Sequence, residues 1–166
     1  MIRETTIYYG VAMRKRWPLP LATEWHALYP EVFDDDDLRQ PRNQPTKHFF
    51  EWLAAIHLYH RDGAFALVEK YGYRNHDRKV QCLDVVLGTE GAEFVRGLKS
   101  VHHVQPPDLF LYVPGTSRYW FAEVKGPTDA LSSKQNASHA LLAERFGVEI
   151  EVIAVRVAPG GVEDSL

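Results

Sequence analysis

Three charged residues in the second half of the chain have the types and spacing that could perform metal-assisted hydrolysis. Asp108 begins one apolar run, and Glu123 and Lys125 end a second. The intervening Pro-Gly-Thr-Ser at 114–117 predicts a hairpin turn. Because side chains alternate along a strand, Glu123 and Lys125 point to the same face, and the hairpin can bring Asp108 beside them. The pattern predicts two carboxylates and a lysine at one point.

This combination suits the hydrolysis of an anionic phosphodiester by water. Mg²⁺ and Mn²⁺ prefer oxygen ligands and keep several waters, and such an ion lowers the pKa of water. We expect Asp108, Glu123 and the backbone carbonyl of Val124 to be metal ligands. Lys125 would orient the attacking water or stabilise charge that develops on the phosphoryl group. A Glu-x-Lys pair on its own is more often a solvated cross-strand pair, so the interpretation depends on the surrounding sequence.

The elements that must position these residues belong to an α/β fold. The predicted elements, in chain order, are a helix over 46–61, a strand or second helix from Gly63, helices over 76–88 and 90–99, strands over 108–113 and 119–125, a helix from Ser132 or Ser133 to Phe146, and a strand over 148–157. Thr46 is the expected N-cap of the first helix, and Gly63 and Gly147 are the expected helix ends. This order predicts a mixed sheet flanked by helices.

Residues 1–45 have a different character. Prolines are frequent there, and we expect irregular structure apart from a short helix near 22–29. The acidic run at 34–37 is expected to be a solvated loop. Apolar residues such as Trp17 and Trp25 are nevertheless too numerous for a free tail. We therefore predict an N-terminal arm over 1–45 that packs on a domain formed by 46–166.

Composition limits the classes of function. The 166 residues suffice for one domain with a core, with 45% hydrophobic and 25% charged residues. A net charge of −3 excludes a generic polyanion binder, so DNA would need a local basic surface. Cys82, the one cysteine, excludes an internal disulfide framework. We find no apolar signal core and no apolar run of roughly 18 residues, so we expect a cytoplasmic protein that does not enter membranes. The candidate DNA contacts are Arg14, Lys15, Arg16, Arg74, Arg78, Lys79, Lys99 and Arg118.

The sequence around the acids also resembles a known family. Pro107-Asp108 followed by Glu123-Val124-Lys125 resembles the core of the PD-(D/E)XK nuclease superfamily. The longer string, Pro-Asp-Leu and then Ala-Glu-Val-Lys-Gly-Pro-Thr-Asp-Ala-Leu-Ser-Ser-Lys-Gln, is similar to the VRR-NUC family, which includes the Fanconi-associated nuclease. The resemblance is specific over about 105–157. It implies a restriction-endonuclease-like core of order α-β-β-β-α-β, with a helical insertion at about 74–100.

The resemblance also implies roles for particular residues. Asp108, Glu123 and Lys125 would be catalytic, and Gln135 would lie near the active site at the start of the following helix. The family carries a further acid on its first helix, which Glu51 fits better than Glu69, because Glu69 lies beyond Gly63. The implied ligands of Mg²⁺ or Mn²⁺ are Glu51, Asp108, Glu123 and the carbonyl of Val124.

The resulting hypothesis is a metal-dependent endonuclease with a role in DNA repair. The resemblance implies a branched substrate, either a Holliday junction or a flap. Junction-resolving members are expected to be homodimers, since two symmetric nicks need two sites, and flap-cutting members act as monomers. Two alternatives remain open: a nuclease-like fold that binds DNA or a protein without cutting, and a sequence-specific restriction endonuclease.

Overall fold

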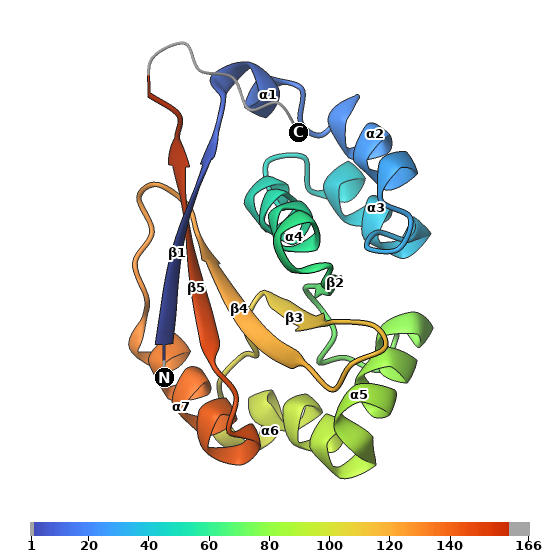
Figure 1. Cartoon of the computed structure of the whole chain (residues 1–166), viewed down its shortest axis with the longest axis vertical. Helices are drawn as coiled ribbons and strands as arrows, with labels where there is room; N and C mark the ends of the chain where they lie inside the picture. The colour runs from blue at the N-terminus through green and yellow to red at the C-terminus, as the bar shows by residue number, and fades with distance from the viewer. Residues whose placement is uncertain (1, 160–166) are drawn as a thin grey trace.

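The computed structural model describes residues 2–159, which form one mixed sheet with helices packed on both faces (Figure 1). The five strands of these residues lie in the order β1-β5-β4-β3-β2. They span Ile2–Tyr9 (β1), Phe65–Val68 (β2), Leu109–Tyr112 (β3), Tyr119–Lys125 (β4) and Ile150–Val157 (β5). β1, β5 and β4 run parallel to one another, whereas β3 is antiparallel to both β4 and β2.

Helices connect the strands and cover the sheet. They span Val11–Lys15 (α1), Leu21–Leu28 (α2), Asp35–Asn43 (α3), Phe49–Asp62 (α4), Asp77–Arg96 (α5), Leu98–His102 (α6) and Ser133–Phe146 (α7). Figure 1 shows α2 and α3 beside α4 at one end of the molecule, with α5, α6 and α7 around the other. Within residues 2–159, no helix combines the length and apolar character that crossing a bilayer requires.

The order α4-β2-β3-β4-α7-β5 confirms the predicted restriction-endonuclease-like core. The helices α5 and α6 lie between β2 and β3, where the helical insertion was expected. α5 covers most of the two helices predicted at 76–88 and 90–99, and Gly88, with φ of 74°, breaks its helical geometry between them. The segment after Gly63 is a strand rather than a second helix.

The alternation of side chains along the strands divides the core in two. Leu109 and Leu111 of β3 pack in the cluster that contains the buried face of α4. Phe110, between them, lies in the opposite cluster with residues of α5, α6 and α7. Phe121 of β4 joins Phe110 there, with the two ring centroids 5.2 Å apart. Close packing on both faces of the sheet restricts the movement of these strands, so the backbone positions of polar residues at the strand ends are well defined.

The expectation that residues 1–45 are irregular outside one helix is wrong. β1 forms an edge strand of the sheet and pairs with β5 in parallel from Ile2↔Ile150 to Tyr9↔Val157. Only Ile7 and Tyr9 of this strand are buried, so the alternation is too short to predict it. Its β-branched and aromatic composition, Thr-Thr-Ile-Tyr-Tyr, is the signal that favours a strand. The helix expected near 22–29 is present as α2.

The acidic run at 34–37 is not a solvated loop. The Asp34 side chain caps α3 by accepting a hydrogen bond from the Asp37 N–H at 2.9 Å. The Asp37 carboxylate in turn accepts from the Asp34 N–H at 3.0 Å, which completes a capping box. Acids in a first turn also suit the positive end of the helix dipole. Asp37 is 2% exposed and therefore belongs to the protein interior.

The helix ends were predicted with mixed success. α4 begins after His48, a left-handed residue with φ of 77°, rather than after Thr46. Its end at Gly63 is confirmed, and Gly147 ends α7 in the same left-handed conformation. Ser132 caps α7 and accepts a hydrogen bond from the backbone N–H of Gln135. Of the two residues predicted to begin this helix, Ser132 and Ser133, Ser132 is therefore the cap.

Candidate active site

Three neighbouring strands bring acidic residues to one place on the sheet. Glu69 directly follows β2, Asp108 directly precedes β3, and Glu123 lies within β4. The Glu69 N–H donates to the Asp108 carbonyl at 2.7 Å, and the Asp108 N–H donates to Glu123 Oε2 at 2.9 Å. Asp108 Oδ2 accepts from the Val124 N–H at 2.8 Å. The hairpin predicted from the sequence is therefore present, and it places Asp108 beside Glu123.

The first turn of α4 contributes a further acid. One carboxylate oxygen from each of Glu51, Glu69 and Asp108 lies within 4.8 Å of the other two. The sequence favoured Glu51 over Glu69 as the additional acid, whereas the structure brings both to the cluster. Among the described residues, Glu123 falls outside this triplet of ligand atoms, although it is hydrogen-bonded to Asp108. The ligand role of the Val124 carbonyl stays a prediction.

Burial and mutual repulsion make the ionised acids unfavourable. Burial and the nearby charges of Asp108 and Glu69 raise the pKa of Glu51 to about 8. Burial, together with the charge of Asp108, raises the pKa of Glu123 to about 9. The pKa of Asp108 is also raised by burial, and the hydrogen bond from the Val124 N–H opposes this shift. Glu51, Asp108 and Glu123 are thus held where a nearby positive charge would make their ionised forms favourable.

A divalent cation fits this arrangement. Carboxylate oxygens at the separations found for Glu51, Glu69 and Asp108 can share one ion. The donors are all oxygens, which Mg²⁺ and Mn²⁺ prefer over nitrogen or sulfur. An ion bound there would stabilise the ionised carboxylates and reverse the unfavourable effect of collecting them. The cluster therefore has the donor set and the unbalanced negative charge of a hard-cation site.

Lys125 reaches the site from the end of β4 and is held by Gln135. Lys125 Nζ donates to Gln135 Oε1 at 2.8 Å. The same oxygen accepts from the Ser132 N–H at 3.0 Å, because Gln135 is the third residue of α7 and part of its capping box. The sequence placed Gln135 near the active site, and the structure places it as the partner of Lys125. Gln135 contacts Lys125 and is not one of the three clustered residues Glu51, Glu69 and Asp108.

Two histidines beside the acids were not singled out from the sequence. His48 Nδ1 contacts the carboxylate of Glu69, and its Nε2 lies 2.7 Å from Gln44 Oε1. His139 of α7 is 3% exposed, and its Nε2 lies 4.0 Å from Glu123 Oε1. Burial lowers the pKa of His139. The four-residue spacing of His139 from Gln135 places both on one helix face, which is the signal that could have found it.

Two cavities meet at Asp108. One, of about 650 Å³, extends along Glu69 and Lys70, and the other, of about 590 Å³, extends along Glu123 and Lys134. The residues lining both are Lys99, His103, Gln105, Pro106 and Asp108. Lys70, Lys99 and Lys134 are exposed, so the walls of both cavities carry positive charge as well as acids. An extended anionic ligand could follow this path past the carboxylates.

The other basic residues proposed as DNA contacts lie elsewhere or are engaged. Lys79 is 2% exposed, so its assignment as a DNA contact is wrong. Arg78 is held in ion pairs with Asp34 and Asp37. Arg118 lies over the ring of Trp120 at 4.5 Å, away from the two cavities. Of the predicted set, Lys99 is the residue that lines the cavities beside the acids.

Comparison with known proteins identifies the family of the chain. The family model of the VRR-NUC domain matches residues 57–158, which is more than half of the chain. The matched range includes Glu69, Asp108, Glu123, Lys125 and Gln135, whereas Glu51 lies upstream of it. A search of curated proteins found no match. The chain belongs to the VRR-NUC family of nucleases.

Proposed function

We propose that this protein is a Mg²⁺- or Mn²⁺-dependent endonuclease that hydrolyses phosphodiester bonds in branched DNA. The observation that carries the proposal is the convergence of Glu51, Glu69 and Asp108, with one carboxylate oxygen from each within 4.8 Å of the others. Lys125, held nearby by Gln135, adds the positive side chain that such chemistry requires. Membership of a nuclease family supports the same conclusion.

Each residue would have a separate task. Glu51, Glu69 and Asp108 would hold the cation, with Glu123 accepting from the Asp108 backbone and completing the negative charge. When bound, the ion would polarise the phosphoryl oxygen and lower the pKa of a coordinated water. Lys125 would orient the attacking water or stabilise the charge that develops on the phosphoryl oxygens. Gln135 would fix the Lys125 ammonium through its amide oxygen.

The two cavities support a nucleic-acid strand as the ligand. Asp108 lines both of them, so a strand that followed the two cavities would pass this acid. Lys99 lines both cavities, and Lys70 and Lys134 each line one. Cations of this kind neutralise backbone phosphates without reading the sequence. A substrate recognised by its shape, such as a flap or junction, agrees with this type of contact.

A homodimer is the form that would suit a Holliday junction, because two symmetric nicks need two sites related by symmetry. A flap needs one cut and therefore one site. Light scattering of the protein alone and with a junction distinguishes the two cases. We propose the dimer for a junction substrate, and a monomer that cuts only flaps would contradict it.

The main rival is a nuclease-like fold that binds DNA or a protein without cutting. A pure binding module gains nothing from collecting acids whose pKa values burial and repulsion raise. The second alternative, a restriction endonuclease, would cut plain duplex at a defined sequence. The two alternatives therefore predict different cleavage results. The binding module would cleave no DNA, and the restriction endonuclease would cleave unbranched duplex.

The test is cleavage of labelled flap, junction, single-stranded and duplex DNA with Mg²⁺ or Mn²⁺. We expect metal-dependent cutting of branched DNA by the wild type and loss of activity in Asp108→Ala and Lys125→Ala. Glu144→Gln, an exposed acid on α7, is the matched control and should cut normally. If the wild type and the two active-site variants all fail to cut every substrate, the proposal that the protein is an endonuclease is refuted. Cutting of duplex at one sequence would favour the restriction enzyme.

A further inference from the structure

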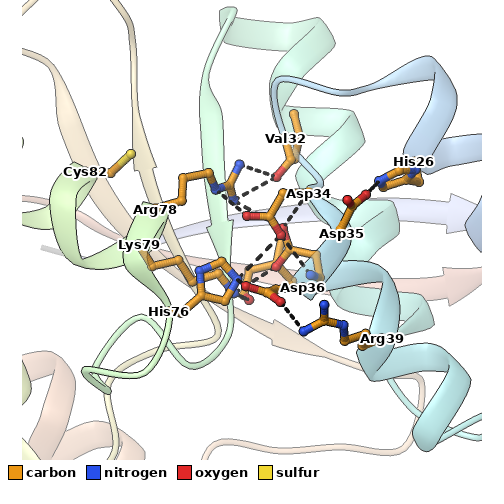
Figure 2. A network of polar contacts seen from close by, with 12 residues as sticks. His26, Val32, Asp34, Asp35, Asp36, Arg39, His76, Arg78, Lys79 and Cys82 are labelled. Carbon is orange, nitrogen blue, oxygen red and sulfur yellow. Dashed lines mark hydrogen bonds and ion pairs between the residues drawn. The ribbon is translucent and has the colours of Figure 1, made fainter.

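A buried ion pair connects the N-terminal part of the chain to the end of β2, the strand that Glu69 directly follows. Asp37 Oδ1 of α3 lies 2.8 Å from Lys79 Nζ of α5, and both side chains are 2% exposed. Figure 2 shows Arg78 and Lys79 reaching from α5 to the acidic run of α3. A charge pair removed from water in this way requires nearly complete compensation by hydrogen bonds.

The remaining hydrogens of Lys79 go to the end of β2. Its Nζ donates to the Val68 carbonyl at 2.6 Å and to the Glu69 carbonyl at 2.9 Å. An ammonium group has three donors, and Asp37, Val68 and Glu69 provide three acceptors. The ammonium is therefore fully satisfied and fixes two successive peptide groups where the strand ends.

This is the point at which the backbone adopts an uncommon conformation. Glu69 and Lys70 have φ of 53° and 52°, in the left-handed region that residues with side chains seldom occupy. Such a conformation persists when surrounding contacts determine it. The Glu69 N–H is bonded to the Asp108 carbonyl, and its own carbonyl is bonded to Lys79. These two bonds set the direction in which the Glu69 side chain leaves the backbone, toward Glu51 and Asp108.

We propose that the Asp37–Lys79 pair is a positioning device that places the Glu69 carboxylate in the metal site. This proposal rests on the metal-dependent function proposed above and extends it to residues that touch neither metal nor substrate. Asp37 lies outside the matched range 57–158, and Lys79 lies in the helical insertion. The N-terminal segment thus supports the geometry of the site as well as adding to the core.

The acids around this pair have a simpler role than a second metal site. Oxygens of Asp34 and Asp37 and a ring nitrogen of His76 also lie within 4.8 Å of one another. However, Arg78 Nε lies 3.0 Å from Asp34 Oδ2, and Lys79 Nζ forms an ion pair with Asp37 Oδ1. Those two cations already compensate the carboxylates, so we assign the cluster to the support of β2 and α3.

The test separates positioning from general stability. Asp37→Leu/Lys79→Met replaces the pair by apolar side chains of comparable size, a change that a folded interior commonly accepts. Mn²⁺ binding to the full chain is measured by titration calorimetry, with circular dichroism to confirm the fold. We expect the folded double variant to bind Mn²⁺ about tenfold more weakly, as when supporting partners of metal ligands are removed. High Mn²⁺ should then restore cleavage of branched DNA, because the ligands themselves are present.

Arg78→Met is the matched control. It removes a neighbouring cation of the same network that contacts Asp34, Asp37 and Val32 but has no hydrogen bond to β2. Its Mn²⁺ affinity should equal that of the wild type. Lys79→Met alone serves as a second variant if the double variant does not fold. Unchanged Mn²⁺ affinity in a folded variant, or failure of both to fold, would overturn the proposal. Absence of Mn²⁺ binding by the wild type would instead refute the proposed metal site.

Discussion

Lys125 and Gln135 are joined by a hydrogen bond of 2.8 Å from the ammonium to the side-chain amide oxygen. The bond crosses from the end of β4 to the first turn of α7. Because the same oxygen accepts from the Ser132 N–H, the cap of the helix and the orientation of the lysine depend on one atom. The position of Lys125 is therefore determined by the start of α7 as well as by its own strand.

Loss of this partner should slow catalysis more than it weakens metal binding. Gln135→Ala removes the acceptor, and we expect kcat to fall by about tenfold, which corresponds to about 1.4 kcal/mol. Mn²⁺ affinity should be unchanged, because Gln135 is not among the three clustered acids. Single-turnover cleavage and titration calorimetry measure the two effects. Gln135→Glu keeps an acceptor oxygen and should lose less activity than Gln135→Ala, and equal losses would argue against the orienting role.

The metal-free protein should become less stable as the pH rises. The pKa of Glu51 is raised to about 8 and that of Glu123 to about 9, from an ordinary value of 4.5. Acids with a raised folded-state pKa contribute stability that is complete below pH 4.5 and is lost progressively as the pH rises from there through about 8 to 9. Thermal unfolding across this range, with and without Mg²⁺, measures the effect. Mg²⁺ should restore stability at the alkaline end, where the acids are ionised.

Glu51→Gln separates this effect from the titration of other groups. The amide cannot ionise, so the variant should lose less stability than the wild type as the pH rises, and Mg²⁺ should stabilise it less. Glu90→Gln, an exposed acid on α5, should behave as the wild type does. A parallel pH dependence in the wild type and Glu51→Gln would contradict the assignment of Glu51 to the repelling cluster.

Much of the catalytic half was predictable because its signals are local. Asp108, Glu123 and Lys125 were placed by the period of a strand and the turn between two strands, which are set by neighbours in the sequence. The capping of α7 by Ser132 is equally local. The family resemblance added Gln135 and Glu51, which strand alternation alone could not select.

The parts that were missed depend on contacts between distant segments. β1 is polar over most of its length and exists because β5 offers a parallel edge more than a hundred residues later. Asp37 and Lys79 are charged residues that periodicity places on a surface, yet they compensate each other in the interior. The position of Glu69 beyond Gly63 favours Glu51 as the additional acid. The left-handed backbone of Glu69 and its bond to the Asp108 carbonyl, which bring it to the site, have no signature in the sequence.

The roles of Glu51 and Glu69 can be distinguished by metal affinity. Because both acids share the cluster with Asp108, Glu51→Gln and Glu69→Gln should each weaken Mn²⁺ binding by at least about tenfold, or about 1.4 kcal/mol. His48→Ala should weaken it less, since His48 contacts Glu69 without joining the cluster. Titration calorimetry measures all three. An unchanged affinity in Glu69→Gln would leave Glu51 as the acid that completes the site with Asp108.

The arm over 1–45 contributes aromatic side chains to the core beside α4. Phe33 stacks on Trp52 of α4 with ring centroids 3.8 Å apart and an interplanar angle of 5°, and both are 1% exposed. Phe33→Ala should therefore lower the free energy of unfolding by about 3–5 kcal/mol, the usual cost of removing a buried ring. Urea denaturation followed by circular dichroism measures the change. Leu28→Ala, at a side chain that is 67% exposed, should change stability by at most about 0.5 kcal/mol. If Phe33→Ala were as mild as this control, residues 1–45 would be an attachment to the domain rather than part of its core.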